Sequence, residues 1–277
     1  MKMCVAIFSV LLTVYGPYSR AQADSDVQQK PSYVFSVLPY RPVPRLEADF
    51  SPFLSEVNRR APFQVSLKLS LNSIKYFELI QDQVADFAIV NPFDSVPAQD
   101  NYGYLPVLSK PLHRCKIITL KNNKIHKLDD LKDKKVGFAS KRSPISFYSE
   151  RVLQKHGLVV NKDYKKVNHK SIYKCLHKLV INKVDACTAA HKAVKAFKHN
   201  RNIEFKELAQ CEAFPGMVFM AHKRVPQENV KTMKALFIKS QHQSKGKAGH
   251  EHKNFSTYRV EQYLDIRKHY KQWLNDQ

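Results

Sequence analysis

The chain has 277 residues, a formal net charge of +22 and 43% hydrophobic residues. That hydrophobic content is normal for a protein with a packed core, and it argues against a disordered or collagen-like chain. The basic excess favours anionic partners, but it does not choose among a small anion, nucleic acid and an anionic membrane. A solvated, lysine-rich surface explains the same charge. The length allows one large domain or two modest ones.

The first residues have the three parts of a secretory signal peptide. A basic start at Lys2 precedes an apolar run at 4–14, and small residues frame the sequence Ala-Gln-Ala at 21–23. The apolar run is too short to span a bilayer, and no later segment approaches 18 uncharged apolar residues. We therefore expect cleavage after Ala23 and a soluble mature protein in the periplasm.

Taken in chain order, strand-like and helix-like patterns alternate in the first half of the mature chain. Apolar residues at 46, 50, 53, 54 and 57 share one face of a helix. Ser73 is expected to cap a second helix, whose inner face includes Ile74, Phe77 and Ile80. Strands are predicted at 33–38, 65–71, 87–90 and 104–108. This βαβαβ order favours a mainly parallel sheet covered by helices.

The pattern restarts after residue 108 and returns near 217, which predicts two α/β lobes with crossings near 110–116 and 209–216. In this organisation residues 1–23 are the signal peptide, 24–32 a loose lead-in, 33–112 with 213–277 the first lobe, and 113–212 the second. Further strands are predicted at 116–120, 136–139, 165–167, 184–188, 205–208 and 217–221, and helices at 143–156, 171–182, 230–240 and 258–274. A polar segment at 241–254 is expected to be flexible.

Four cysteines follow the signal peptide, at Cys115, Cys175, Cys187 and Cys211. No pair has CxxC spacing, so the sequence indicates neither a zinc ribbon nor a thioredoxin motif. An oxidising envelope allows one or two disulfides, in any of three connectivities. Partly buried free thiols fit the sequence equally well.

The strongest local signal for a binding site is the start of the helix predicted at 143–156. Ser143 suits the N-cap and Pro144 the first helical position. The first-turn amides of Ile145 and Ser146 then point outward from the positive end of the helix, where anions bind readily. Two basic residues, Lys141 and Arg142, precede the cap and add charge. A well-capped helix with nothing bound is the alternative.

Three other candidates also follow strands. His169 follows the strand at 165–167, Asn91 and Phe93 follow the strand at 87–90, and Tyr40 follows the first strand. In open α/β sheets ligands bind at the carboxyl ends of the strands, so we expect these side chains to meet Ser143 and Ser146 across a cleft between the lobes. Taken alone, His169 is more often an ordinary surface histidine.

Other chemistry is poorly supported. The sequence lacks a G-x-S-x-G elbow, a Walker loop, an HExxH motif and a recognisable nucleic-acid-binding motif. The histidines at 250 and 252 could bind a metal, but their segment is polar and such pairs are usually incidental. We therefore predict no catalytic residue, no metal, no cofactor and no nucleic-acid partner.

With these segments placed, the chain resembles a known family, the periplasmic solute-binding proteins for phosphate, phosphite and phosphonate that serve ABC transporters (PhnD-like proteins). The resemblance covers about 33–230 and is carried by short pieces in order: FSVLP at 35–39, ADFAIVNP at 85–92, LDDLKDKKVGF at 128–138, the serine loop, NH at 168–169, KVDA at 183–186 and FPG at 214–216. It implies a two-lobed type II periplasmic binding fold, a monomer that closes on a small anion and a membrane permease as partner. It also implies ligand contacts at Tyr40, the 91–93 region, Ser143 to Ser146 and His169.

Two departures mark the chain as a divergent member. The loop reads KRSPIS at 141–146, without the usual run of small hydroxyl residues and glycine, and Pro144 removes one amide donor. No acidic residue stands where relatives bind a ligand amine, because His191 and Gly216 occupy those places, so an amino-bearing ligand is disfavoured. A ligand-sensing protein that serves a membrane sensor is the main alternative, and a hydrolase or a polyanion binder is more remote.

Overall fold

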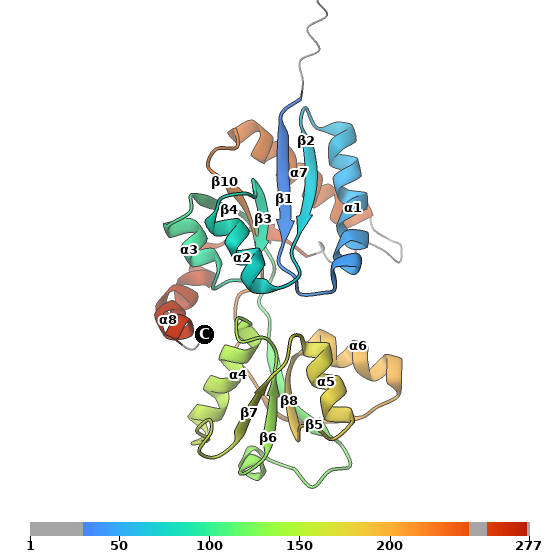
Figure 1. The fold of residues 1–277 in the computed structure, drawn as a ribbon, viewed down its shortest axis with the longest axis vertical. Coiled ribbons are helices and arrows are strands. Elements are labelled where there is room, and N and C mark those ends of the chain that lie inside the picture. Colours follow the sequence, from blue (N-terminus) through green and yellow to red (C-terminus); the bar gives the residue numbers. More distant parts are fainter. Residues whose placement is uncertain (1–29, 244–253, 276–277) are drawn as a thin grey trace, which may run out of the picture.

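The computed structural model describes residues 30–243 and 254–275, which form two α/β lobes, one above the other in Figure 1. We call the described residues up to 114 and from 212 onward lobe 1, and residues 115–211 lobe 2. Each lobe holds one sheet flanked by helices, as the alternating pattern predicts. The expected signal peptide, residues 24–29 of the lead-in and the histidines at 250 and 252 lie outside the described residues.

Lobe 1 is built on a six-stranded sheet with the order β11-β4-β10-β3-β1-β2. Its strands are β1 (Ser32–Val37), β2 (Gln64–Leu69), β3 (Phe87–Val90), β4 (Tyr104–Ser109), β10 (Val218–His222) and β11 (Ser256–Thr257). Strand β1 pairs in parallel with β2 and β3, whereas β10 runs antiparallel to β3 and β4. The parallel character expected from the sequence is found at β3-β1-β2, and β10 adds antiparallel pairs because it returns from the other lobe.

The helices of lobe 1 match the predicted apolar spacing well in α1 and less well in α2. They are α1 (Val43–Arg60), α2 (Ser73–Gln81), α3 (Ser95–Asp100), α7 (Gln227–Gln243), the 3₁₀ turn η2 (Val260–Tyr263) and α8 (Leu264–Asn275). All five apolar residues predicted to share a face of α1 are buried. The N-cap of α2 is Asn72 and not Ser73, because the Asn72 side chain accepts a backbone bond of 2.9 Å. Ile74, expected inside, is 65% exposed, and Tyr76 is buried instead, with its hydroxyl donating to the Ile89 carbonyl at 2.7 Å.

Lobe 2 is built on a five-stranded sheet with the order β7-β6-β8-β5-β9, parallel at β7-β6-β8 and antiparallel at β8-β5-β9. Its elements are β5 (Cys115–Leu120), η1 (Leu128–Leu131), β6 (Lys135–Phe138), α4 (Pro144–Lys155), β7 (Lys165–Asn168), α5 (Ile172–Val180), β8 (Ala186–Ala190), α6 (His191–Arg201) and β9 (Phe205–Gln210). Helix α6, and α3 in lobe 1, were not predicted from the sequence, because α6 has few large apolar residues and α3 is only six residues long.

Two disulfides cross-link lobe 2. Cys115 is bonded to Cys211, with a Cα–Cα distance of 5.1 Å, and Cys175 to Cys187, with a distance of 6.0 Å. The first joins the two ends of the lobe, 96 residues apart in sequence, and the second joins α5 to β8. This pairing is one of the three connectivities that the sequence leaves open.

The chain passes between the lobes twice, at 110–114 and at 211–217. The two crossings form a short antiparallel bridge, in which the His113 amide donates to the Phe214 carbonyl at 2.7 Å and the Phe214 amide donates back at 2.9 Å. Gly216 fits only without a side chain, because a Cβ there would lie 2.7 Å from the carbonyl oxygen of Pro111. None of the described helices is both long enough and apolar enough to cross a membrane.

Candidate functional site

The end of the loop between β6 and α4 and the first turn of α4 hold three of the predicted contacts. Ser143 is the N-cap of α4, as predicted, but its side chain makes no capping bond, so the helix leaves its hydroxyl unused. Ser146 is 2% exposed, and its hydroxyl donates to the Ser140 carbonyl at 3.0 Å. Ile145, between them, is half-buried and packs against the core. Of the two serines, Ser143 is the one whose hydroxyl remains available at the positive end of the α4 dipole.

Arg142, directly before this cap, reaches from lobe 2 to lobe 1. Its guanidinium donates to the carboxylate of Asp94, which follows Phe93 in the loop after β3. The Arg142 side chain is 18% exposed and that of Asp94 is fully buried. The Nε of Arg142 is also buried, and among the described residues it has no hydrogen-bond partner. The ion pair therefore joins the two strand-end loops that the sequence analysis places at the ligand site.

Within lobe 1, Asp94 is hydrogen-bonded to Asn91. The Asn91 amide donates to the Asp94 carboxylate, and its Oδ1 accepts the Asp94 backbone N–H at 2.9 Å. Asn91 is 3% exposed, so its polar atoms are directed at its own loop. Burial raises the pKa of Asp94 from 3.8 to about 6, although the charge of Arg142 and the bonds from Arg142 and Asn91 lower it. Removing the carboxylate from water thus outweighs its compensation by one cation.

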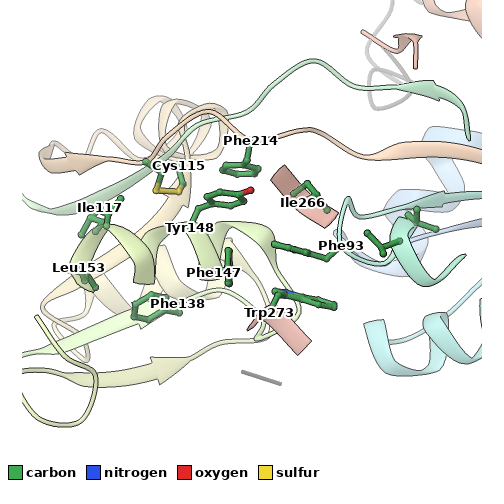
Figure 2. Packing of buried hydrophobic residues seen from close by; sticks show 14 of the residues in the cluster. Phe93, Cys115, Ile117, Phe138, Phe147, Tyr148, Leu153, Phe214, Ile266 and Trp273 are labelled. Carbon is green, nitrogen blue, oxygen red and sulfur yellow. A yellow bond between two sulfur atoms is a disulfide. The ribbon is translucent and has the colours of Figure 1, made fainter. Parts of the chain in front are cut away.

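An aromatic cluster surrounds this ion pair. Phe93, predicted as a pocket wall, is fully buried and stacks on Trp273 of α8, with ring centroids 4.8 Å apart and planes inclined by 7°. Phe147 of α4 meets Phe93 edge-on at 5.0 Å, so both lobes and the C-terminal helix converge here (Figure 2). The Arg142 guanidinium lies 4.7 Å from the ring of Phe77 and 5.0 Å from that of Trp273. These rings exclude water, which strengthens the electrostatic interaction inside.

Helix α8 lies beside the junction of the lobes and contacts both (Figure 1). Its Asp265 accepts a bond of 3.0 Å from the hydroxyl of Tyr148 in α4. Its Arg267 donates two bonds, of 2.8 and 2.9 Å, to the carboxylate of Asp100 in α3. The helix therefore connects lobe 1 to lobe 2 next to the Arg142–Asp94 pair.

The structure places His169 at the expected strand end but turns its ring away from α4. The His169 amide donates to the Phe138 carbonyl at 2.9 Å, so its backbone lies beside the end of β6. A Cβ built on Gly137 would lie 3.3 Å from His169 Nε2 and 2.6 Å from the Cys175 sulfur. The ring thus lies on the face of the sheet covered by α5, whereas Ser143 begins the helix on the other face. Burial, followed by nearby lysines, lowers the pKa of His169.

Tyr40, the remaining predicted contact, lies in the loop after β1. Its backbone amide donates to the Leu38 carbonyl at 2.8 Å, and its half-buried ring packs against the core of lobe 1. The structure therefore brings Asn91, Phe93, Ser143 and Ser146 to the junction of the lobes.

The roles of Asp94, Arg142 and Trp273 were not predicted from the sequence. Arg142 was noted only as added charge, and Asp94, which is fully buried, was assigned no role. The signal for Asp94 was its place directly after Asn91 and Phe93, at a strand end. Nothing local points to Trp273, because its partner Phe93 lies far away in the sequence.

Other regions supply no stronger chemistry. A cavity of about 750 Å³ lies on the outside of lobe 2, between α5 and α6, lined by Tyr173, Lys174, His177, Lys178, Phe197 and Arg201. Its lining residues include no carboxylate, and they come from α5 and α6 rather than from α4. Within residues 30–243 and 254–275, no group of three His, Cys, Asp or Glu side chains could hold a metal ion.

The family model described as "ABC transporter, phosphonate, periplasmic substrate-binding protein" matches residues 35–262. A search of curated proteins finds no significant match. Among solved structures, PhnD1 from Prochlorococcus marinus in complex with methylphosphonate has a TM-score of 0.75 and 15% identity, covering 90% of this chain and 100% of that one. A binding protein component of an ABC phosphonate transporter from Pseudomonas aeruginosa has a TM-score of 0.72 and 16% identity, covering 90% and 88%. SsuA from Xanthomonas axonopodis pv. citri, bound to MOPS, has a TM-score of 0.62 and 16% identity, covering 90% and 94%.

These similarities confirm the two-lobed type II periplasmic binding fold and the resemblance to PhnD-like proteins expected from the short sequence pieces. Members of the matched family are transport binding proteins of the periplasm. Because the match runs from β1 to η2 and so covers both lobes, the chain belongs to the family of periplasmic phosphonate-binding proteins of ABC transporters.

Proposed function

We propose that this chain is a non-enzymatic binding protein that captures a small oxyanion of the phosphate, phosphite or phosphonate class between its lobes and delivers it to an ABC-transporter permease. The observation that supports this most directly is the position of the Arg142 guanidinium. It puts a fixed positive charge, with an unused Nε–H, beside the N-terminus of the 12-residue helix α4. Helix N-termini and arginine forks both favour oxyanions.

The contacts we propose come from both lobes. From lobe 2 they are the hydroxyl of Ser143 and the first-turn amide of Ile145, and from lobe 1 the amide of Asn91. The Ser146 amide, expected to point outward, instead donates to the Ser143 carbonyl at 2.9 Å. Three of the expected contacts require rearrangement, because His169 turns toward α5, Ser146 donates its hydroxyl to the Ser140 carbonyl, and Asn91 donates its amide to Asp94. The proposed set is Tyr40, Asn91, Phe93, Ser143, Ile145, Ser146 and His169, with Arg142 added.

The surface charge supports capture of an anion. Residues 115–211 contain 23 Lys and Arg against 8 Asp and Glu, which gives lobe 2 a net charge of +15. Such a field raises the association rate of small anions and depends on ionic strength. It contributes less to the choice of ligand, which depends on the groups that contact it.

The chemical class of the oxyanion is best decided by direct competition. Similar folds hold methylphosphonate in PhnD1 and MOPS, a sulfonate, in SsuA. We would measure thermal unfolding of the mature protein with methylphosphonate, phosphite, phosphate, sulfate and MOPS. A bound ligand at about 100 times its dissociation constant stabilises the native state by roughly 2.7 kcal/mol. No shift with any of these anions would contradict the proposal.

Calorimetry on variants then locates the site. Replacing Ser143 by Ala removes one bond to a charged oxygen and should weaken binding about ten- to a hundredfold. The matched control is Lys183→Ala, which removes an exposed charge at the other end of β8 and should leave affinity nearly unchanged. If Ser143→Ala binds like the wild type, the ligand lies elsewhere. Recovery of the ligand chemically unchanged after incubation checks that the protein is not an enzyme.

A further inference from the structure

The guanidinium of Arg142 is only partly satisfied by its partner. One terminal nitrogen donates to Asp94, while the buried Nε has no hydrogen-bond partner among the described residues. A guanidinium presents five N–H donors in a rigid plane and binds an oxyanion best through two of them. The pair observed here therefore leaves a buried donor that an oxyanion with several oxygens can use.

Asp94 is chemically the same kind of partner as the ligand. Its carboxylate is a small oxyanion, it is fully buried, and it comes from the lobe opposite Arg142. The rings of Phe77 and Trp273 lie on the guanidinium, so Arg142 is held in one place whichever anion it binds. The carboxylate and an incoming oxyanion consequently compete for one cation at the junction of the lobes.

We propose that Asp94 is an internal competitor of the ligand, which holds Arg142 and joins the lobes in the empty protein and gives up the guanidinium when an oxyanion binds. This inference rests on the proposed function and adds to it the two residues that set the affinity. Arg142 is the charged contact of the ligand, and Asp94 determines how strongly an anion must bind to replace it.

Displacement changes the protonation of Asp94. Among the described residues the groups that face it are Arg142, the Asn91 amide, and the hydroxyl-bearing rings of Tyr76 and Tyr270, and of these only Arg142 is charged at neutral pH. The pKa of Asp94 is about 6 with Arg142 in place, and loss of that cation raises it further. Ligand binding is therefore coupled to proton uptake. Affinity falls as the pH rises through this range, because the ionised carboxylate competes and the neutral one does not.

The test is calorimetry of the wild type and Asp94→Asn with methylphosphonate and with sulfate, from about pH 5.5 to about pH 7.5, where sulfate itself does not titrate. Asparagine keeps the shape of Asp94 but carries no charge. At the upper pH we expect Asp94→Asn to bind roughly ten- to a hundredfold more tightly than the wild type. With sulfate, its affinity should no longer depend on pH.

The matched control is Asp86→Asn. Asp86 precedes β3 whereas Asp94 follows it, and it is likewise buried and bonded to an arginine, with 2.7 Å between its Oδ1 and Arg224 Nε. Both partners belong to lobe 1, so this change should lower stability and leave the affinity as in the wild type. Arg142→Lys keeps the charge but loses the planar fork. We expect it to weaken binding both when made alone and when combined with Asp94→Asn.

Each outcome bears on the inference. If Asp94→Asn and the wild type bind equally at every pH, the competition is contradicted while the proposed function stands. If Asp94→Asn binds an anion that the wild type does not, the competition is supported. If neither protein binds any of the anions, the proposed function is wrong and so is this inference. Asp94→Ser serves as a second neutral variant if Asp94→Asn does not fold.

Discussion

The two lobes contain similar sheets but are stabilised in different ways. Lobe 1 has a core of phenylalanine rings, with Phe35, Phe53, Phe219 and Phe237 in contact at centroid distances of 4.9 to 6.1 Å. In lobe 2 the two disulfides fasten the ends of the lobe and tie α5 to the sheet. Packing thus dominates in one lobe, and covalent cross-links add to packing in the other.

Their charges differ as well. Residues 115–211 carry a net charge of +15, whereas the described residues of lobe 1 contain 18 Lys and Arg against 12 Asp and Glu. Like charges on one small lobe repel each other and favour expansion. A disulfide opposes expansion because it restricts the unfolded chain. We infer that the cross-links help lobe 2 to stay compact despite its net charge of +15.

The largest effect we predict is loss of the Cys115–Cys211 bond. The chain-entropy relation gives about 4.7 kcal/mol for a loop of about 100 residues, against about 3 kcal/mol for 15 residues. The double change of Cys115 and Cys211 to Ala should therefore lower the free energy of unfolding more than the double change of Cys175 and Cys187. Denaturant unfolding of both variants measures this. A larger loss from the shorter loop would contradict the entropic explanation.

The aromatic core of lobe 1 should respond to truncation. Phe219 is fully buried on the central strand β10, so Phe219→Ala should cost about 3–5 kcal/mol. Leu105→Ala, on the neighbouring strand β4, is the control, because Leu105 is 57% exposed and its loss should cost little. Adding a reductant should destabilise Phe219→Ala and the wild type equally. A stronger effect of reductant on the variant would show that the lobes do not stabilise themselves independently.

Much of the fold could be predicted because its signals are local. The strand at 87–90 was predicted with its observed ends, since a short run of apolar residues buried on both faces has a clear pattern. The start of α4 followed from the preferences of Ser143 and Pro144. Helix α6 was not predicted because Val194 and Phe197 are its only large apolar residues.

The site was less predictable because its contacts are distant in sequence. Asp94 and Arg142 are 48 residues apart in two polar loops, and neither loop shows which charge the other brings. Trp273 reaches Phe93 from the other end of the chain. The His169 ring lies beside Gly137, whose missing side chain leaves room for the Cys175 sulfur and for the ring. Such features follow from tertiary packing, between the lobes or within lobe 2. They do not follow from any local preference of the sequence.

The smallest effect we predict concerns α8, which belongs to lobe 1 by sequence but contacts both lobes. Its Arg267 donates from one nitrogen to both carboxylate oxygens of Asp100, but the two side chains are 36% and 47% exposed. An exposed pair is screened by water and costs side-chain entropy, so Arg267→Ala should lower stability by about 0.5–1 kcal/mol. The loss should shrink in high salt. Lys268→Ala removes the same charge from an exposed position on the same helix. Comparing the two variants therefore separates the contribution of the ion pair from the effect of removing one positive charge. Thermal unfolding at low and high salt measures both variants.

Because Trp273 and Ile266 are buried, we attribute the attachment of α8 to apolar packing at the junction. A loss above about 2 kcal/mol from Arg267→Ala alone would reverse that attribution and make α8 a part of lobe 1 held mainly by its charge.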